Sequence, residues 1–86
     1  MGELSKAVNI GPKVEEQLFS VGITSLEKLK EVGAKNAWLR IQEIDSSACI
    51  HRLLALEGAI QGVKKSDLPD SVKADLKTFY NSHKIY

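Results

Sequence analysis

Five consecutive residues near the start of the chain, Asn9-Ile10-Gly11-Pro12-Lys13, have the types and order that suit the binding of a phosphate group. Pro is favoured at the first position of a helix, and the free N–H groups of a helix N-terminus can face an anion. Small residues let that backbone come close, and Lys13 adds a direct charge contact. Asn tolerates the left-handed dihedrals that a tight turn requires. We therefore take Asn9, Gly11 and Lys13 as candidate nucleic-acid-binding residues.

The segments on either side of these residues complete a larger pattern. Leu4 to Val8 predicts a short helix, the Asn9–Lys13 hairpin follows, and a second helix begins at Pro12. This order resembles the helix-hairpin-helix pattern, of which many DNA-binding versions carry Gly where this chain has Asn9. The alternative interpretation is architectural, because Gly-Pro is a common helix start and Ile10 can simply fill the core between helices.

Charge gives little support to nucleic-acid binding. The chain has 12 basic and 11 acidic residues and a pI near 7.9, whereas dedicated duplex binders usually have a pI above about 9. Residues 1–33 contain four lysines against five glutamates, a net charge of −1. Glu15 and Glu16 stand one turn into the helix after the hairpin, where we expect them to repel a phosphate. A protein-binding module with no direct DNA contact is therefore the alternative.

A second candidate is an acidic residue in the most apolar helical segment, about residues 48–61. In helical projection Glu57 falls inside the apolar face, with Gln61 one turn later beside it. A buried carboxylate needs a partner, so we predict that Glu57 and Gln61 form a structural tether to the hairpin or to the third helix. A catalytic or ligand-binding acid is the alternative. Gly58 and Gly62 make a smooth patch that predicts a close helix crossing, with a dimer face as the other interpretation.

Catalytic and metal sites find no support in the residue spacing. Cys49 and His51 are two residues apart, so on a helix they point in different directions, and His83 is far along the chain. We expect no enzyme activity, cofactor, metal or small-molecule substrate. On the last helix Lys73, Lys77, Tyr80 and Lys84 share one face, which suits either nucleic acid or plain solvation.

Glycine, proline and small polar residues divide the chain into helices. Gly22, Gly33 and Gly62 predict helix ends, and a capping box from Thr24 to Glu27 predicts a start. Ser46 or Ser47 is the expected cap of the next helix. The predicted helices cover about residues 12–21, 24–32, 35–44 and 48–61, with a last one beginning at Leu68-Pro69-Asp70. No segment alternates with period two over the length of a strand.

Apolar residues recur at helical spacing in each of these segments, and Trp38 is the expected core anchor. The residues predicted to face inward are Val14, Leu18 and Val21; Leu26, Leu29 and Val32; Ala37, Trp38, Ile41 and Ile44; Ile50, Leu53, Leu54, Leu56, Ile60 and Val63; and Val72, Leu76, Phe79 and His83.

Nearly the whole chain resembles the C-terminal domain of TfoX. The resemblance is carried by Leu4, Asn9–Pro12, Val21–Ile23, Leu26–Leu29, Val32–Ala34, Leu53–Gly62 and Leu68-Pro69. It implies a bacterial regulator of natural competence that acts on transcription. TfoX-like proteins usually place this domain after an N-terminal domain, so the resemblance implies a stand-alone copy here. It brings no catalytic residues, and Asn9, Gly11, Pro12 and Glu57 match its motifs as a signature.

These observations together predict an all-α fold, a compact bundle of five or six short helices with a helix-hairpin-helix-like unit at the N-terminal end. We expect residues 1–86 to form a single domain, with Cys49 packed as a small hydrophobe. One cysteine, no signal segment and no long apolar run predict a cytoplasmic protein without membrane contact. The expected partners are DNA, bound weakly and without sequence preference, or a regulatory protein, and the expected state is a monomer or weak dimer.

Overall fold

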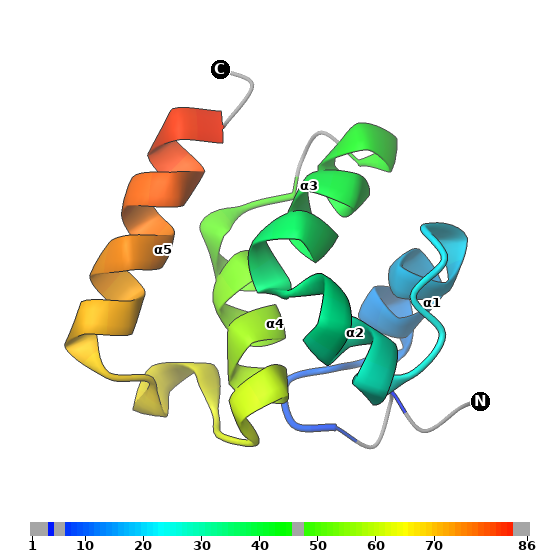
Figure 1. Cartoon of the computed structure of the whole chain (residues 1–86), viewed down its shortest axis with the longest axis horizontal. Helices are drawn as coiled ribbons and strands as arrows, with labels where there is room; N and C mark the ends of the chain where they lie inside the picture. The colour runs from blue at the N-terminus through cyan, green and yellow to red at the C-terminus, as the bar shows by residue number, and fades with distance from the viewer. Residues whose placement is uncertain (1–3, 5–6, 46–47, 84–86) are drawn as a thin grey trace.

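The computed structural model describes residues 4, 7–45 and 48–83, and in these ranges it contains five α-helices and no strand. The all-α prediction is therefore confirmed. A 3₁₀ turn, η2, covers Lys65–Asp67 between the last two helices. The helices are α1 (Pro12–Ser20), α2 (Leu26–Val32), α3 (Ala34–Ile44), α4 (Ile50–Gln61) and α5 (Asp70–His83), shown in Figure 1.

Glycines mark the ends of three helices, as predicted. Gly22, Gly33 and Gly62 have φ angles of 85°, 87° and 74°, values that L side chains rarely adopt. Gly33 both ends α2 and precedes α3, so it turns the chain sharply between two helices. One predicted cap is wrong by a residue. The hydroxyl of Ser25, and not that of Thr24, accepts the Lys28 N–H at 3.1 Å.

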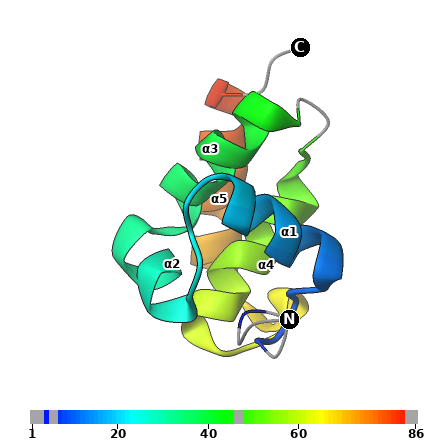
Figure 2. The ribbon, with the colours of Figure 1, turned by 90° about the vertical axis from the view of Figure 1, so that its right-hand side faces the viewer.

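The start of α4 also differs from the sequence prediction. Ser46 and Ser47, the predicted caps, lie outside the described residues. The N-cap position of α4 is held by Cys49, whose side chain makes no capping hydrogen bond. The apolar contacts of α4 compensate for this weak start, because the helix lies at the centre of the molecule between α5 and the helices α1–α3 (Figures 1 and 2).

The core confirms most of the predicted inward residues. Trp38, Leu53 and Leu56 are fully buried, and α4 packs against α2, α3, η2 and α5. The prediction of an inward position is wrong for two residues. Ile44 is 55% exposed because it occupies the last turn of α3, beyond the packed length of the helix, and His83 is exposed in the last turn of α5. The buried apolar side chains are Leu4, Ile10, Leu18, Ile23, Leu29, Ala34, Ala37, Trp38, Ile41, Ala48, Leu53, Ala55, Leu56, Ala59, Leu68 and Leu76.

Trp38 connects α3, α5 and the start of α4, which confirms its predicted role as a core anchor. The Trp38 indole N–H donates to the Cys49 carbonyl at 3.2 Å. Its ring meets the rings of Phe79 and Tyr80 edge to face, with centroids 6.2 and 5.6 Å apart. These contacts hold the C-terminal half of α5 against the rest of the molecule.

Candidate nucleic-acid interface

The Asn9–Lys13 hairpin leads into α1 through a left-handed residue. Asn9 has a φ of 70°, as the sequence predicts for a tight turn. Ile10 is 4% exposed and packs into the core, while Gly11, Pro12 and Lys13 are exposed. Ile10 thus fills the core as the architectural interpretation predicts, while the start of α1 faces solvent and phosphate binding there stays a prediction. Ser5 and Lys6, in the helix predicted before the hairpin, lie outside the described residues.

The first turn of α1 has backbone donors without intrahelical partners, as any helix start does. The first helical hydrogen bond runs from the Glu15 N–H to the Gly11 carbonyl at 3.0 Å. Gly11 has no side chain with which to cap the helix, and Pro12 has no N–H. The N–H groups of Lys13 and Val14 thus remain at the exposed end of the helix, where the helix dipole favours an anion.

The side chain of Asn9 does not face solvent as a ligand contact, because it bonds to the chain around the end of α4. Its Nδ2 donates to the Val63 carbonyl at 3.0 Å and, at the longer distance of 3.5 Å, to the Ala55 carbonyl. Its Oδ1 accepts the Lys65 N–H at 3.3 Å. Of the three candidate residues, Gly11 and Lys13 therefore present atoms to solvent. Asn9 instead fixes the hairpin against α4 and η2.

Gly58 makes room for this arrangement. A Cβ at this position would lie 2.7 Å from the Val63 carbonyl oxygen and 3.3 Å from the Lys65 nitrogen, and it would overlap the Asn9 amide. The predicted close helix crossing at Gly58 and Gly62 is not found among the described residues, because nothing there lies within 4 Å of a Cβ placed at Gly62 and no α-helix crosses α4 at Gly58. Gly58 does permit a close approach of another kind. Its partner is the hairpin amide and the chain after α4, a contact that helical periodicity within one segment does not reveal.

The acidic pair that follows the hairpin is divided by the fold. Glu15 is fully buried, whereas Glu16 at the next position is exposed. Of the two carboxylates, only that of Glu16 therefore lies at the surface, and the repulsion of a phosphate by this pair stays a prediction. Helical geometry places residues 15 and 18 on the same face, and Leu18 is also fully buried. The predicted inward position of Leu18 was the available signal that Glu15 points inward.

A polar cluster that was not predicted from the sequence holds α1 in position. Gln17 Nε2 donates to Asp45 Oδ2 at 2.8 Å, and Arg52 Nη1 contacts the same oxygen at 3.0 Å. The Asp45 and Arg52 side chains are 23% and 17% exposed, so the ion pair is partly shielded from solvent. This cluster joins α1, the end of α3 and the start of α4. The Arg52 guanidinium is therefore held in the ion pair with Asp45.

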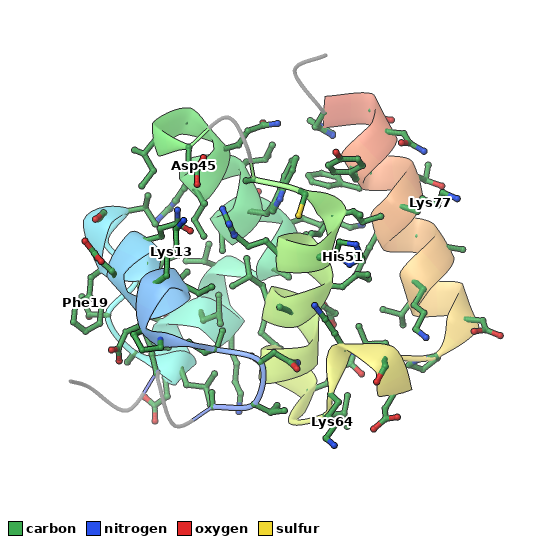
Figure 3. All side chains as sticks on the ribbon, turned by 180° about the vertical axis from the view of Figure 1, so that it is seen from behind. Lys13, Phe19, Asp45, His51, Lys64 and Lys77 are labelled. Carbon is green, nitrogen blue, oxygen red and sulfur yellow. The ribbon has the colours of Figure 1, made fainter. Side chains whose placement is uncertain are left out.

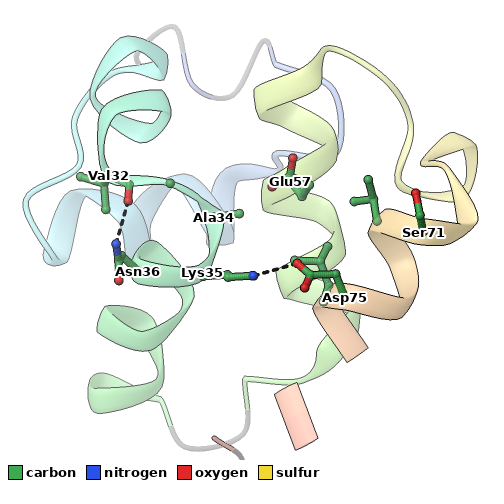
Figure 4. A pocket seen from close by; sticks show the side chains of 10 residues that line it. Val32, Ala34, Lys35, Asn36, Glu57, Ser71 and Asp75 are labelled. Carbon is green, nitrogen blue, oxygen red and sulfur yellow. Dashed lines mark hydrogen bonds and ion pairs between the residues drawn. The ribbon is translucent and has the colours of Figure 1, made fainter. Parts of the chain in front are cut away.

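Glu57 lies beside a cleft and Gln61 is exposed, so neither residue is inside the core. Gln61 Nε2 donates to Glu57 Oε2 at 2.6 Å, a bond within one helix. Among the described residues no hydrogen bond joins Glu57 to a second element, so the predicted tether stays a prediction. Glu57 lines a cleft of about 470 Å³ between the start of α3, α4 and α5 (Figure 4). Lys35 and Asp75 form an ion pair across this cleft at 2.7 Å.

The sequence matches the TfoX C-terminal domain over residues 1–80. The chain belongs to the TfoX C-terminal domain family. Among curated proteins it is 34% identical over 74 residues to protein Sxy of Escherichia coli K12, a match that covers 86% of this chain and 35% of Sxy. The chain thus spans about a third of the length of this relative, and the resemblance stated from the sequence is confirmed.

Solved structures share the fold of this TfoX C-terminal domain. A crystal structure of an uncharacterised Listeria monocytogenes protein, in a triclinic form, has a TM-score of 0.93 at 44% identity and covers 96% of this chain and 94% of its own. A tetragonal form, of a Listeria protein of unknown function, has a TM-score of 0.90 at 47% identity, covering 92% and 96%.

The part of this TfoX C-terminal domain that the structure describes has neither a metal-ligand cluster nor a membrane-spanning helix. Within residues 4, 7–45 and 48–83, no group of three or more His, Cys, Asp or Glu residues could hold a metal ion. Over the same residues, none of the helices combines the length and the apolar character that crossing a membrane requires.

Proposed function

We propose that this TfoX C-terminal domain is a non-enzymatic regulatory module that contacts the DNA backbone through the exposed start of α1, without sequence preference. The family membership supports a role in the regulation of competence or transcription. One observation carries the DNA contact. Beside the exposed Gly11, Lys13 presents its backbone N–H and its ammonium group to solvent, while Asn9 holds the turn in place from behind.

The acidic residues at the start of α1 act against this contact. Glu16 is exposed and repels a phosphate near Lys13. Glu15 is buried, and burial alone does not cancel the repulsion. The near-neutral net charge of the chain also makes binding weak and dependent on a few local contacts, which is typical of backbone binding without base readout.

The prediction for the hairpin concerns Lys13→Gln. We expect this change to weaken binding to labelled duplexes of any sequence by about fivefold, and to lower the slope of log affinity against log salt by about 1. Fluorescence anisotropy at about 50 and about 150 mM salt measures both quantities. Duplexes of two unrelated sequences test the lack of preference.

Lys30→Gln is the matched control, because Lys30 is exposed in the last turn of α2 and the change in net charge is the same. An equal reduction of affinity in both variants would show general attraction with no role for the hairpin. If the wild-type domain does not bind at about 50 mM salt, where phosphate contacts are strongest, the hairpin is architecture only.

The cleft beside Glu57 favours a second candidate function, that of a protein-interaction module. The cleft carries Glu57 and Asp75 together with Lys35 and the apolar side chains of Val32, Val72 and Leu76. Such a mixture of charged and apolar groups suits a protein partner better than a nucleic acid. Failure of DNA binding, combined with loss of regulation in cells carrying Glu57→Lys and normal folding of that variant, would establish this alternative.

A further inference from the structure

We propose that the Lys64–Lys65 turn, which follows α4, is a second phosphate contact that works together with the hairpin. This inference rests on the proposed function, because it names the additional residues with which the domain contacts the same DNA backbone. Lys64 and Lys65 are far from the hairpin in sequence, and the fold brings them beside it.

Asn9 determines this placement. Its amide donates to the carbonyl of Val63 at 3.0 Å and accepts the N–H of Lys65 at 3.3 Å. Lys64 therefore lies between two residues whose backbones bond to the same side chain. Both bonds use backbone atoms of the turn, so the lysine side chains take no part in them. Figure 3 shows Lys13 on α1 and Lys64 on the turn, on either side of the segment that leads into α1.

The two ammonium groups are available to a ligand. The side chains of both lysines are exposed, and neither forms an ion pair with any residue in the described parts of the chain. Lys73 adds a third cation to the same region, since its Nζ donates to the Ser66 carbonyl at 2.8 Å. Asp67, exposed at the end of η2, opposes them.

A nucleic-acid backbone is the ligand that this arrangement fits best. Lysine contacts phosphate as a flexible point charge and needs no fixed geometry, in contrast to the bidentate contacts that arginine makes to bases. Lysines on two neighbouring segments, one at a helix start and one on a turn, match a strand that repeats its phosphate at regular intervals. The Asn9–Lys13 hairpin contains one cation, Lys13, and the Lys64–Lys65 turn adds two more positive charges for the same DNA backbone.

The test is the double variant Lys64→Gln/Lys65→Gln in the full chain, with the same labelled duplexes and salts. We expect affinity at about 50 mM salt to fall about tenfold and the salt slope to decrease by about 1 to 2, because each phosphate that the protein no longer neutralises lowers the slope by about 1. Thermal unfolding should stay unchanged, because the bonds to Asn9 use the backbone. Asp67→Asn should change affinity in the opposite direction, raising it about twofold, because the variant removes a negative charge that repels the phosphate.

The matched control is Lys28→Gln/Lys30→Gln, which removes the same charge from α2. An equal reduction of affinity in this control would overturn the proposal, since it would show attraction by net charge only. Wild-type affinity in Lys64→Gln/Lys65→Gln, with clearly weaker binding by Lys13→Gln, would overturn the second contact and leave the proposed function intact. Absence of any binding by the wild-type domain would overturn both.

Discussion

Trp38→Ala is expected to lower the free energy of unfolding by about 3–5 kcal/mol, the usual cost of removing a large buried aromatic side chain. Natural domains have a total of about 5–15 kcal/mol, so the variant should lose a large share of its stability. Trp38 is fully buried, bonds to the Cys49 carbonyl and packs against Phe79 and Tyr80. Its removal leaves a cavity where α3, α4 and α5 meet.

Urea unfolding followed by far-ultraviolet circular dichroism measures this change, since the chain has one Trp and the variant lacks its fluorescence. Trp38→Phe serves as the comparison. It keeps an apolar ring but removes the N–H donor, and we expect a smaller destabilisation that includes about 1 kcal/mol for the hydrogen bond. A destabilisation below about 1 kcal/mol in Trp38→Ala would mean that α5 does not depend on this contact, against the packing in the structure.

The helical framework was predictable because its signals are local. A glycine at the end of an apolar stripe, or Gly-Pro before one, acts within a few residues of the position it marks. Gly22, Gly33 and Gly62 therefore mark the ends of the first, second and fourth helices correctly. Caps were harder, because Thr24 and Ser25 are both good capping residues and sequence alone does not distinguish them.

The candidate site was predictable only in part, because its decisive contacts join distant segments. The left-handed turn at Asn9 could be predicted from the sequence, yet the residue itself was assigned to a ligand. The partners of the Asn9 amide are Ala55, Val63 and Lys65. No local pattern indicates such a contact. Its one trace in the sequence is Gly58, an otherwise unfavourable residue in the middle of a helix.

Acidic residues were misjudged for a related reason. The helical projection placed Glu57 within an apolar face, but a projection does not say how much of that face a neighbour covers. Glu57 stands where the cleft opens between α3 and α5 and is only half-buried. Glu15 lies in a helix with fewer apolar residues and is fully buried. Tertiary packing decides between these two outcomes.

Gly58→Ala is expected to lower the free energy of unfolding by about 1–3 kcal/mol, as extra atoms in a tightly packed interior do. Intrinsic propensity predicts the opposite sign, because Ala stabilises a helix interior by about 1 kcal/mol relative to Gly. The packing effect should dominate, since the new Cβ would stand 2.7 Å from a backbone carbonyl oxygen and overlap the Asn9 amide. Urea unfolding of the variant and of Ala74→Gly, an exposed residue within α5 changed in the reverse direction, measures the packing and propensity contributions separately.

Asn9→Gly completes a double-mutant cycle with Gly58→Ala. Glycine keeps the positive φ at position 9 but loses the hydrogen bonds to Val63 and Lys65, so this variant alone should be destabilised by about 1–2 kcal/mol. In the Asn9→Gly background the alanine no longer meets the amide. The double variant should therefore be more stable than the sum of the single effects predicts, by at least about 0.5 kcal/mol. Strict additivity would contradict the contact between these positions.

The same cycle links stability to DNA binding. Asn9→Gly changes no charge, and it creates the glycine that many DNA-binding hairpins carry at this position. If Asn9 itself contributed nothing beyond a left-handed turn, affinity for duplex DNA would be unaffected. We expect affinity to fall about threefold, because the Lys64–Lys65 turn is then no longer fixed beside the hairpin. Binding must then also order this turn, and the lost conformational entropy lowers the affinity. Anisotropy at about 50 mM salt, the condition that favours phosphate contacts, distinguishes the two results.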